Sequence, residues 1–284
     1  MKVGVIGGSG LYDLPGLTDI QEEPISTPFG TASDNFITGT LHETPVVFLP
    51  RHGKGHRLLP TEIPFRANIW GMKKLGVTHL ISVSAVGSLK EEIAPGHIVF
   101  PDQFIDRTRQ RVSTFFGKGI VAHVQFGDPI CSHLLGIVTQ AAEDAKATYH
   151  KGGTYVCMEG PVFSTRAESN LYRSWDASII GMTNIQEAKL AREAEMCFTT
   201  IALATDYDCW HHAEEEVTID QILEVMRNNI ETSKKILART LEILPAERPC
   251  SCGSALQYGI ITQPDLIPMQ TRSDLDILIG KYLS

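Results

Sequence analysis

Short apolar runs of strand length alternate along the chain with longer segments in which apolar residues recur every three or four positions. The apolar runs end near glycine or proline, which is typical of buried strands that lead into turns. The expected strands are residues 3–7, 45–49, 80–85, 97–100, 154–157, 178–182 and 197–205. The expected helices are residues 64–75, 130–145, 166–175, 187–194 and 218–244. Because strands that are apolar throughout need cover on both faces, the pattern predicts an α/β fold.

The chain reads as one large domain with an appendage. Its 284 residues correspond to about two domains at ~150 residues each, but open α/β sheets often exceed that size. The last long helix opens with a capping-box pattern at Thr218 and Gln221 and ends before Pro245. We therefore expect a main domain over residues 1–245. Residues 246–284 have no long periodic segment, so we expect an arm packed on the main body or on a neighbouring subunit.

Composition and charge narrow the class of protein. Hydrophobic residues make up 43% and charged residues 20% of the chain, which is an ordinary globular balance, and the net charge is −8. An acidic chain is a poor partner for nucleic acid. The longest apolar runs are far shorter than the ~20 residues of a membrane helix, and the N-terminus has no secretory pattern. We expect a cytoplasmic protein that binds neither nucleic acid nor membranes.

Six cysteines do not form a disulfide scaffold in a chain of this length. Cys131, Cys157, Cys197 and Cys209 are scattered, and we expect reduced, mostly buried thiols. The pair Cys250 and Cys252 has no second C-x-x-C partner, which argues against a zinc site. A redox pair, a local disulfide and two ordinary thiols all remain open for this pair.

A glycine-rich turn, Gly7-Gly8-Ser9-Gly10, follows the first strand. Backbone N–H groups and a serine hydroxyl in such a turn suit a phosphate. A dinucleotide-binding turn would need a third glycine, where the chain has Asp13, and no Gly-Lys-Ser/Thr follows as in a P-loop. A tight turn without a ligand is the alternative.

Two further segments follow strands in the same way. One is the run of residues 51–56, Arg-His-Gly-Lys-Gly-His, which suits an anion or is a solvated basic loop. The other is residues 84–88, Ser-Ala-Val-Gly-Ser, where small residues let a ligand approach the backbone or simply form a turn. Ligands of open α/β sheets bind at the carboxyl ends of strands, which favours the functional interpretation of both.

Asp206 and Asp208 end the strand expected at residues 197–205. Alternate residues of a strand point the same way, so the two carboxylates should share one site, and like charges that close raise one pKa. Solvated or capping aspartates are the alternative. A metal site that also uses His211, His212 and Glu214 is disfavoured, because no fixed ligand spacing appears.

Six segments together resemble the trimeric purine nucleoside phosphorylase family. They are GGSGLYD, PRHGKGH, SAVGSLKEEIAPGHIVFPDQFIDRT, MEGPVFSTRAES, GMTNIQEAKLAREAEMCF and ATDYDCW, within residues 1–245. The resemblance implies a central mixed, partly closed β-sheet flanked by helices, with the C-terminal arm added. It also implies a homotrimer, sometimes paired into a hexamer, which needs no metal or organic cofactor. Inorganic phosphate is then a co-substrate.

The resemblance also assigns roles to matching positions. The phosphate-binding residues are Ser9, Arg51, His52, Ser84, Ala85 and Thr183. Met182 lies against the ribose, and Asp206 and Asp208 face the base, with Asp206 as the general acid for a purine leaving group. His123 matches a position that completes the 5′ pocket of the neighbouring subunit.

Three positions bear on the substrate. Relatives that use 6-oxopurines carry Asn at the base-facing position, and Glu where this chain has Ser164. Ile219 stands where those relatives place a His for the 5′-hydroxyl, and an apolar residue there suits a methylthio group. The resemblance therefore implies phosphorolysis of S-methyl-5′-thioadenosine to adenine and 5-methylthioribose 1-phosphate. Phosphorolysis of a 6-oxopurine nucleoside or of methylthioinosine is the alternative.

Asn184-Ile185-Gln186 departs from the family, which has a Thr/Val-Pro stretch there, so we expect an altered loop near the phosphate. The glycine-rich turn leaves one alternative from another class of function. This is a nucleotide-binding regulatory or dehydrogenase-like module. The missing third glycine and the aspartate pair argue against it.

Overall fold

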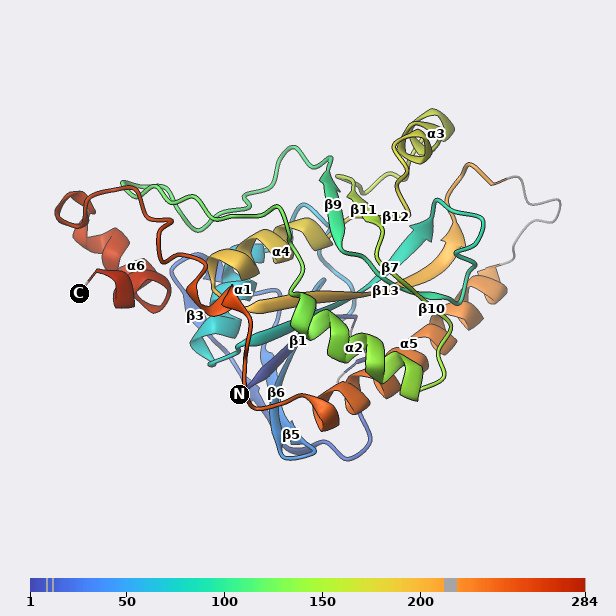
Figure 1. The fold of residues 1–284 in the computed structure, drawn as a ribbon, viewed down its shortest axis with the longest axis horizontal. Coiled ribbons are helices and arrows are strands. Elements are labelled where there is room, and N and C mark those ends of the chain that lie inside the picture. Colours follow the sequence, from blue (N-terminus) through green and yellow to red (C-terminus); the bar gives the residue numbers. More distant parts are fainter. Residues whose placement is uncertain (9, 12, 212–218, 284) are drawn as a thin grey trace.

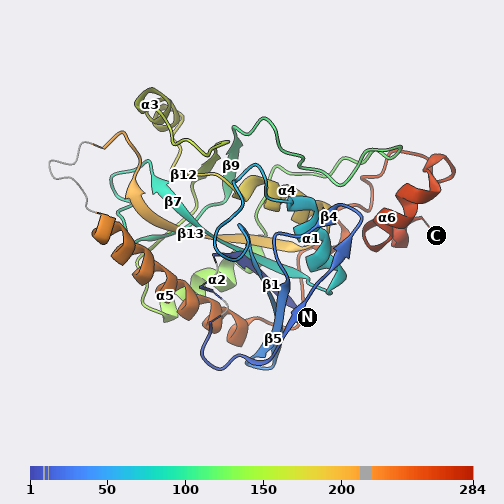
Figure 2. The same cartoon turned by 180° about the vertical axis from the view of Figure 1, so that it is seen from behind.

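The computed structural model describes all residues except 9, 12, 212–218 and 284, and only the backbone of residues 219–223. A mixed sheet of eleven strands forms its centre, and helices cover both faces (Figures 1 and 2). The strands of this sheet are β1 (Val3–Gly7), β2 (Thr18–Glu23), β5 (Phe36–Leu41), β6 (Thr44–Pro50), β7 (His79–Ser88), β8 (Ile98–Phe100), β9 (Gln103–Asp106), β10 (Tyr149–Lys151), β11 (Thr154–Cys157), β12 (Ile179–Gly181) and β13 (Cys197–Tyr207). A separate hairpin joins β3 (Ser26–Thr27) and β4 (Gly30–Thr31).

The main path of the sheet runs β10-β8-β13-β7-β1-β6-β5-β2. Its central strands β13, β7, β1 and β6 are parallel neighbours, and β1 is buried along its whole length. The sheet branches at β7, whose last residues pair antiparallel with β12, and β12 continues through β11 to β9. Parallel central strands bring several carboxyl ends to one edge, which is where ligands of such sheets bind.

Six helices are described. They are α1 (Phe65–Lys74), α2 (Ser132–Asp144), α3 (Arg166–Ser174), α4 (Asn184–Glu193), α5 (Ile219–Ile243) and α6 (Met269–Ile279). In Figure 1, α1 and α4 lie above the sheet while α2 and α5 lie below it. Gly76 follows α1 with φ of +83°, a conformation that favours glycine, and the helix ends at Lys74, close to the end expected at residue 75. Helix α3 begins with a capping box between Thr165 and Glu168.

The C-terminal segment, residues 246–284, packs against the main body of the same chain. Leu256, Ile267 and Leu275 are buried and join the principal hydrophobic core. The Trp70 indole N–H donates to the carbonyl of Asp274 at 3.2 Å. The segment also contains α6, a helix that the sequence pattern did not predict.

The expected central mixed sheet flanked by helices is confirmed, and every expected strand and helix is present with small shifts of its ends. The edge strand β2 and its neighbour β5 were not predicted, because β2 is almost wholly exposed and β5 is only half buried. Within the described part of the chain, none of the helices combines the length and apolar character that a membrane crossing requires.

Candidate active site

Three of the segments singled out in the sequence meet at one edge of the sheet. Gly7 pairs with Pro50, and Ile6 pairs with Ser82, so β1 and β6 end together beside β7, which continues to Ser88. The Arg51 backbone N–H donates to the Gly7 carbonyl at 2.9 Å, which joins the basic loop to the glycine-rich turn. Ser9 itself lies outside the described residues.

Arg51 is not the free cation that a basic loop would offer. Its side chain is buried, and its Nε and Nη2 donate to the two carboxylate oxygens of Glu187 at 2.6 and 3.0 Å. The guanidinium also donates to the Val83 carbonyl at 2.9 Å and the Ser82 hydroxyl at 2.7 Å. The charge of Arg51 is therefore paired inside the protein, just beneath the strand ends, and any phosphate contact would use the Nη1 hydrogen that remains.

His52 is the next residue of this loop, and its ring is neutral near pH 7. Its pKa is lowered to about 4, mainly by burial and also by the nearby Arg51 charge, against the opposing effect of the Leu58 carbonyl. Because a carbonyl can only accept, the contact of 2.8 Å between Nδ1 and Leu58 assigns the proton to Nδ1. Nε2 is then an acceptor, suited to a protonated phosphate oxygen.

The small residues of β7 leave polar groups open to a ligand. The Ser84 hydroxyl is buried and has no hydrogen-bond partner among the described residues. Ala85 is exposed although its neighbours on β7 are buried. Thr183 is buried and directly precedes α4, so the free backbone N–H groups of that helix end are close by.

Asp206 and Asp208 both lie against Gly87 of β7. A methyl group built on Gly87 would stand 3.6 Å from the Asp206 carboxylate and 3.5 Å from the Asp208 Cβ. The Asp206 carboxylate accepts from the Thr205 hydroxyl at 2.7 Å. One carboxylate oxygen of Asp208 is buried without a partner among the described residues.

Burial raises the pKa of Asp206, and the charge of Asp208 raises it further, while the Thr205 hydrogen bond opposes both. The residue is nevertheless exposed in this single chain, so solvent reaches part of it. The direction agrees with the expectation from the aspartate pair, whereas proton donation to a base stays a prediction.

A loop before α3 closes the site on the side of β13. The Met182 carbonyl accepts a hydrogen bond from Arg111. A Cβ on Gly160, whose φ is +68°, would stand only 2.5 Å from the Met182 sulfur, so only glycine allows this approach. The carbonyl of Ser164 accepts from the Cys209 thiol at 3.3 Å, next to Asp208. Ser164 therefore lies beside the aspartate segment, and Met182 contacts the same loop through Gly160.

Two predicted residues are not placed in this chain's own site by any described contact. His123 is exposed, and its backbone N–H donates to the Gly259 carbonyl of the C-terminal segment at 2.8 Å. Ile219 is the first residue of α5, and its side chain is outside the description.

The sequence did not reveal three residues that support the site. They are Glu187, which holds Arg51, Arg111, which holds Met182, and Asn184. Asn184 donates to the Ser82 hydroxyl and accepts from Thr200, each at 2.8 Å. The departure at residues 184–186 therefore forms the first turn of α4 rather than an altered loop. This departure from the family was the one sequence signal for any of the three residues. The pairing of Glu187 with Arg51 gave none, because the two residues are 136 positions apart.

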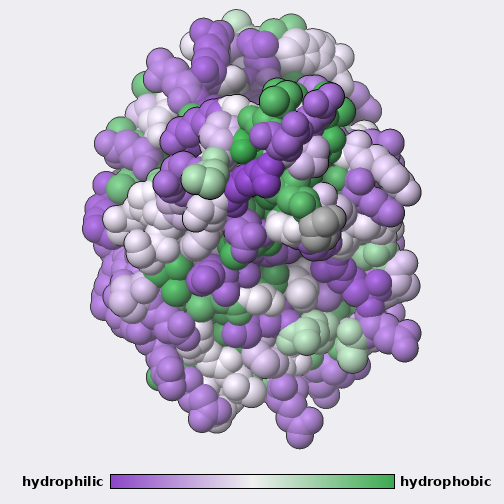
Figure 3. All heavy atoms as spheres, turned by 90° about the vertical axis from the view of Figure 1, so that its left-hand side faces the viewer, coloured by the Kyte–Doolittle hydropathy of each residue, from purple (hydrophilic) through white to green (hydrophobic). Residues whose placement is uncertain are grey.

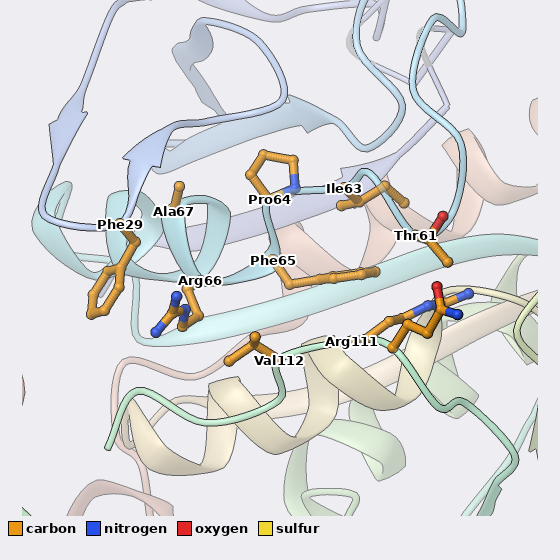
Figure 4. A pocket seen from close by; sticks show the side chains of 10 residues that line it. Phe29, Thr61, Ile63, Pro64, Phe65, Arg66, Ala67, Arg111 and Val112 are labelled. Atoms are coloured by element: carbon orange, nitrogen blue, oxygen red, sulfur yellow. The ribbon is translucent and has the colours of Figure 1, made fainter. Parts of the chain in front are cut away.

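A separate hollow of about 190 Å³ lies between the start of α1 and residues 110–112. Figure 4 shows Phe65 of α1 facing Arg111 and Val112 across this hollow. The ten residues that line it include none of the predicted site residues. It touches the site only through Arg111.

Comparison with known proteins then decides the family. The model of the phosphorylase superfamily matches residues 2–242. The chain belongs to this superfamily. It is 60% identical to the S-methyl-5′-thioadenosine phosphorylase of Geobacter sulfurreducens over 282 residues, which cover 99% of each chain. The protein of that name from Koribacter versatilis is 58% identical and covers 99% of this chain and 96% of its own.

Solved structures agree with the sequences. A methylthioadenosine phosphorylase from an antarctic soil metagenomic library superposes with a TM-score of 0.94 at 45% identity, covering 97% of this chain and 98% of its own. The enzyme of that name from Schistosoma mansoni, in complex with adenine, gives a TM-score of 0.84 at 35% identity, covering 91% and 96%. The chain is an enzyme of the pentosyltransferase type.

Proposed function

We propose that the chain catalyses the reversible phosphorolysis of S-methyl-5′-thioadenosine to adenine and 5-methylthioribose 1-phosphate. The observation that carries this proposal is the 60% identity, over 99% of both chains, to a protein with that activity in its name. The aspartate pair at Gly87 supports an aminopurine base. A 6-oxopurine nucleoside or methylthioinosine is not favoured as the substrate.

Phosphate attacks C1′ of the ribose while the bond from C1′ to N9 of adenine breaks. A dianion held beside the sugar stabilises the positive charge that develops on the ring. The Ser84 hydroxyl, the exposed Ala85 segment and the end of α4 at Thr183 support an anion site at the sheet edge. Arg51 contributes one guanidinium hydrogen to this anion site, and His52 contributes a neutral ring nitrogen. We assign Ser9 to the same phosphate site.

Adenine leaves with the electron pair of the broken bond, so a proton must reach N7. Burial and the charge of Asp208 raise the pKa of Asp206, which favours a carboxyl group that can hold this proton. The unpartnered oxygen of Asp208 can accept from the 6-amino group of adenine. Met182 lies against the ribose, and neither a metal nor an organic cofactor takes part.

The decisive test compares methylthioadenosine with inosine, each with and without phosphate, in wild type and Asp206→Asn. We expect the wild type to require phosphate and to prefer methylthioadenosine. Loss of the general acid should lower kcat/KM for methylthioadenosine by ~10²-fold or more. The matched control is Asp102→Asn, which should keep full activity. Asp102 is an exposed carboxylate that accepts from the Gly153 N–H. An Asp206→Asn enzyme with unchanged activity would refute the role of Asp206.

We also propose a homotrimer, in which His123 completes the 5′ pocket of a neighbouring subunit. The segment that carries His123 pairs with the C-terminal segment, and apolar side chains beside it are exposed. They include Val121, Tyr258, Ile261 and Met269, of which Tyr258 is 88% exposed. Figure 3 shows this end of the molecule, where apolar side chains gather among polar ones. An exposed apolar face of this kind is typical of a subunit interface.

Sedimentation equilibrium tests the assembly, with three times 31.3 kDa as the expected mass. Twice that mass would show that trimers pair. Ile261→Asp should dissociate the trimer and raise the KM for nucleoside, whereas His123→Ala should raise that KM without dissociation. A monomeric wild type of full activity contradicts the proposal. A cytoplasmic location belongs to the same proposal, and trapping free thiols in intact cells would test it.

A further inference from the structure

Four of the six cysteines meet at one point in the fold, at the opposite end of β13 from the aspartate pair. The sulfur atoms of Cys131, Cys197, Cys250 and Cys252 all lie within 4.8 Å of one another. Three of these residues are buried and Cys250 is half buried. Among the described residues this is the one group of potential metal ligands that converges in this way.

The cluster joins two parts of the chain. Cys131 directly precedes α2, and Cys197 is the first residue of β13, so both belong to the main domain. Cys250 and Cys252 follow α5, at the start of the C-terminal segment. The sequence analysis argued against zinc because the latter pair has no second C-x-x-C. The fold supplies two single cysteines in its place.

The backbone fixes the first two ligands independently of the others. The Cys131 N–H donates to the Phe198 carbonyl, and the Cys197 N–H donates to the Thr78 carbonyl, both at 2.9 Å. The two thiols are therefore held at the same end of β13 by the hydrogen bonds of the sheet and of the loop before α2. They form a fixed half-site to which the C-terminal pair is added.

The spacing suits a tetrahedral thiolate site. Four sulfurs at ~2.3 Å from a zinc ion stand about 3.8 Å from one another. The Cys197 and Cys250 sulfurs are 3.2 Å apart, and no pair exceeds 4.8 Å, so shifts of about an ångström would complete the site. Disulfides would join these cysteines two at a time, and they give no reason for all four sulfurs to share one centre.

The surroundings favour negative charge on sulfur. Cys131 directly precedes α2, where the partial positive charge of the helix N-terminus stabilises a thiolate. The Arg248 guanidinium packs on Gly253, the residue after Cys252. It lies where it can offset part of the two negative charges of a zinc ion with four thiolates.

We propose that Cys131, Cys197, Cys250 and Cys252 bind one Zn²⁺ as a structural tetrathiolate site that fastens the C-terminal segment to the sheet. Binding replaces the thiol protons, up to four of which go to solvent, and transfers no electrons. A closed site with four protein ligands has no position for substrate, so the ion acts on stability rather than on catalysis. This proposal departs from the expectation that the chain carries no metal.

The test starts with the full-length protein, purified under reducing conditions without chelator. We expect about one zinc ion per chain by elemental analysis. Titration with a mercurial should release this zinc as the four thiols of the cluster react. The protein reconstituted with Co²⁺ should show the intense visible absorption of a tetrahedral thiolate site. Removing the zinc should increase hydrogen exchange around Leu256 of the C-terminal segment.

Variants separate this site from the other cysteines. Cys252→Ser should lose the zinc and the cobalt spectrum, whereas Cys157→Ala, another buried cysteine outside the cluster, should keep both. If Cys252→Ser does not fold, Cys250→Ser takes its place, because that residue is less buried.

Three results would overturn the proposal. The first is reduced wild-type protein that contains no zinc and binds neither added Zn²⁺ nor Co²⁺ in stoichiometric amount. The second is a metal-free protein whose intact mass is lower by two hydrogens for each of two disulfides. The third is a folded Cys252→Ser protein that retains its zinc.

Discussion

The buried pair of Arg51 and Glu187 offers the sharpest test of how the phosphate side of the site is built. Their side chains are 3% and 1% exposed, and the closest contact, from Nε to the carboxylate, is 2.6 Å. Changing Glu187 to Gln keeps the shape but leaves the Arg51 charge buried without its counter-charge. Removing one partner of a buried ion pair costs about 3–5 kcal/mol of unfolding free energy.

That cost can be read as a melting temperature. At about 2–4 °C per kcal/mol for a chain of this size, Glu187→Gln should lower Tm by about 6 °C or more. The matched control is Asp144→Asn. Asp144 contacts the Nε of Arg239 at the same 2.6 Å, but these side chains are 31% and 39% exposed. A surface pair of this kind contributes about 0–1 kcal/mol, so the control should melt close to wild type.

The same pair links stability to phosphate binding. Arg51→Met combined with Glu187→Leu removes both charges together, which is often nearly neutral for stability. We expect this double variant to melt near wild type. Its KM for phosphate should rise much more, relative to wild type, than its KM for nucleoside. The reasoning is refuted if Glu187→Gln and Asp144→Asn cost the same, or if the double variant keeps the wild-type KM for phosphate.

Three further predictions use other parts of the structure. Burial raises the pKa of Glu193 from 4.5 to about 7, so the folded state holds the proton more tightly than the unfolded state. The free energy of unfolding should therefore fall by about 3 kcal/mol as the pH rises from about 5 to about 8. Glu193→Gln should flatten that curve in urea unfolding across pH, and an unchanged slope would contradict this. Gly160→Ala should displace Met182 and raise the KM for nucleoside several-fold, whereas Gly30→Ala, with φ of +95° and nothing within 4 Å, should not. Ile219→His should reduce the preference for methylthioadenosine over adenosine by about 10–200-fold; a constant ratio with a lower Tm would mean that Ile219 is structural.

The sequence predicted those elements whose pattern is local. β1, α1 and α5 follow from apolar runs, helical spacing and their terminating glycine or proline, so their ends agree with the structure within a few residues. β2 could not be predicted, because almost all its side chains are exposed and its place depends on pairing with β5. α6 lies in a segment without a strong apolar period.

The site divides in the same way. The glycine-rich turn, the loop at Arg51 and the aspartate pair could be singled out as candidates because each lies at the end of a buried strand. The pairing of Arg51 with Glu187 and the approach of Cys131 to Cys252 could not be found, because each depends on packing between segments more than a hundred positions apart. The basic character of residues 51–56 did not reveal, for the same reason, that Arg51 is paired with Glu187 and that burial lowers the pKa of His52.

In the proposed function, the pairing of β7 with β13 sets the distance between the phosphate side and the base side of the site. Ser84 on the anion side and Gly87, which the aspartates flank, are three residues apart on one continuous strand. At ~3.3 Å per residue this interval is about 10 Å, and it is held by the backbone of a central strand rather than by loops. Exchange of the ligand, movement of loops and substitutions in the pocket for the 5′ group of the ribose therefore leave the interval between Ser84 and Gly87 unchanged. Relatives that share this strand should differ in which base or sugar they prefer, but hardly in the distance between the phosphate and the base.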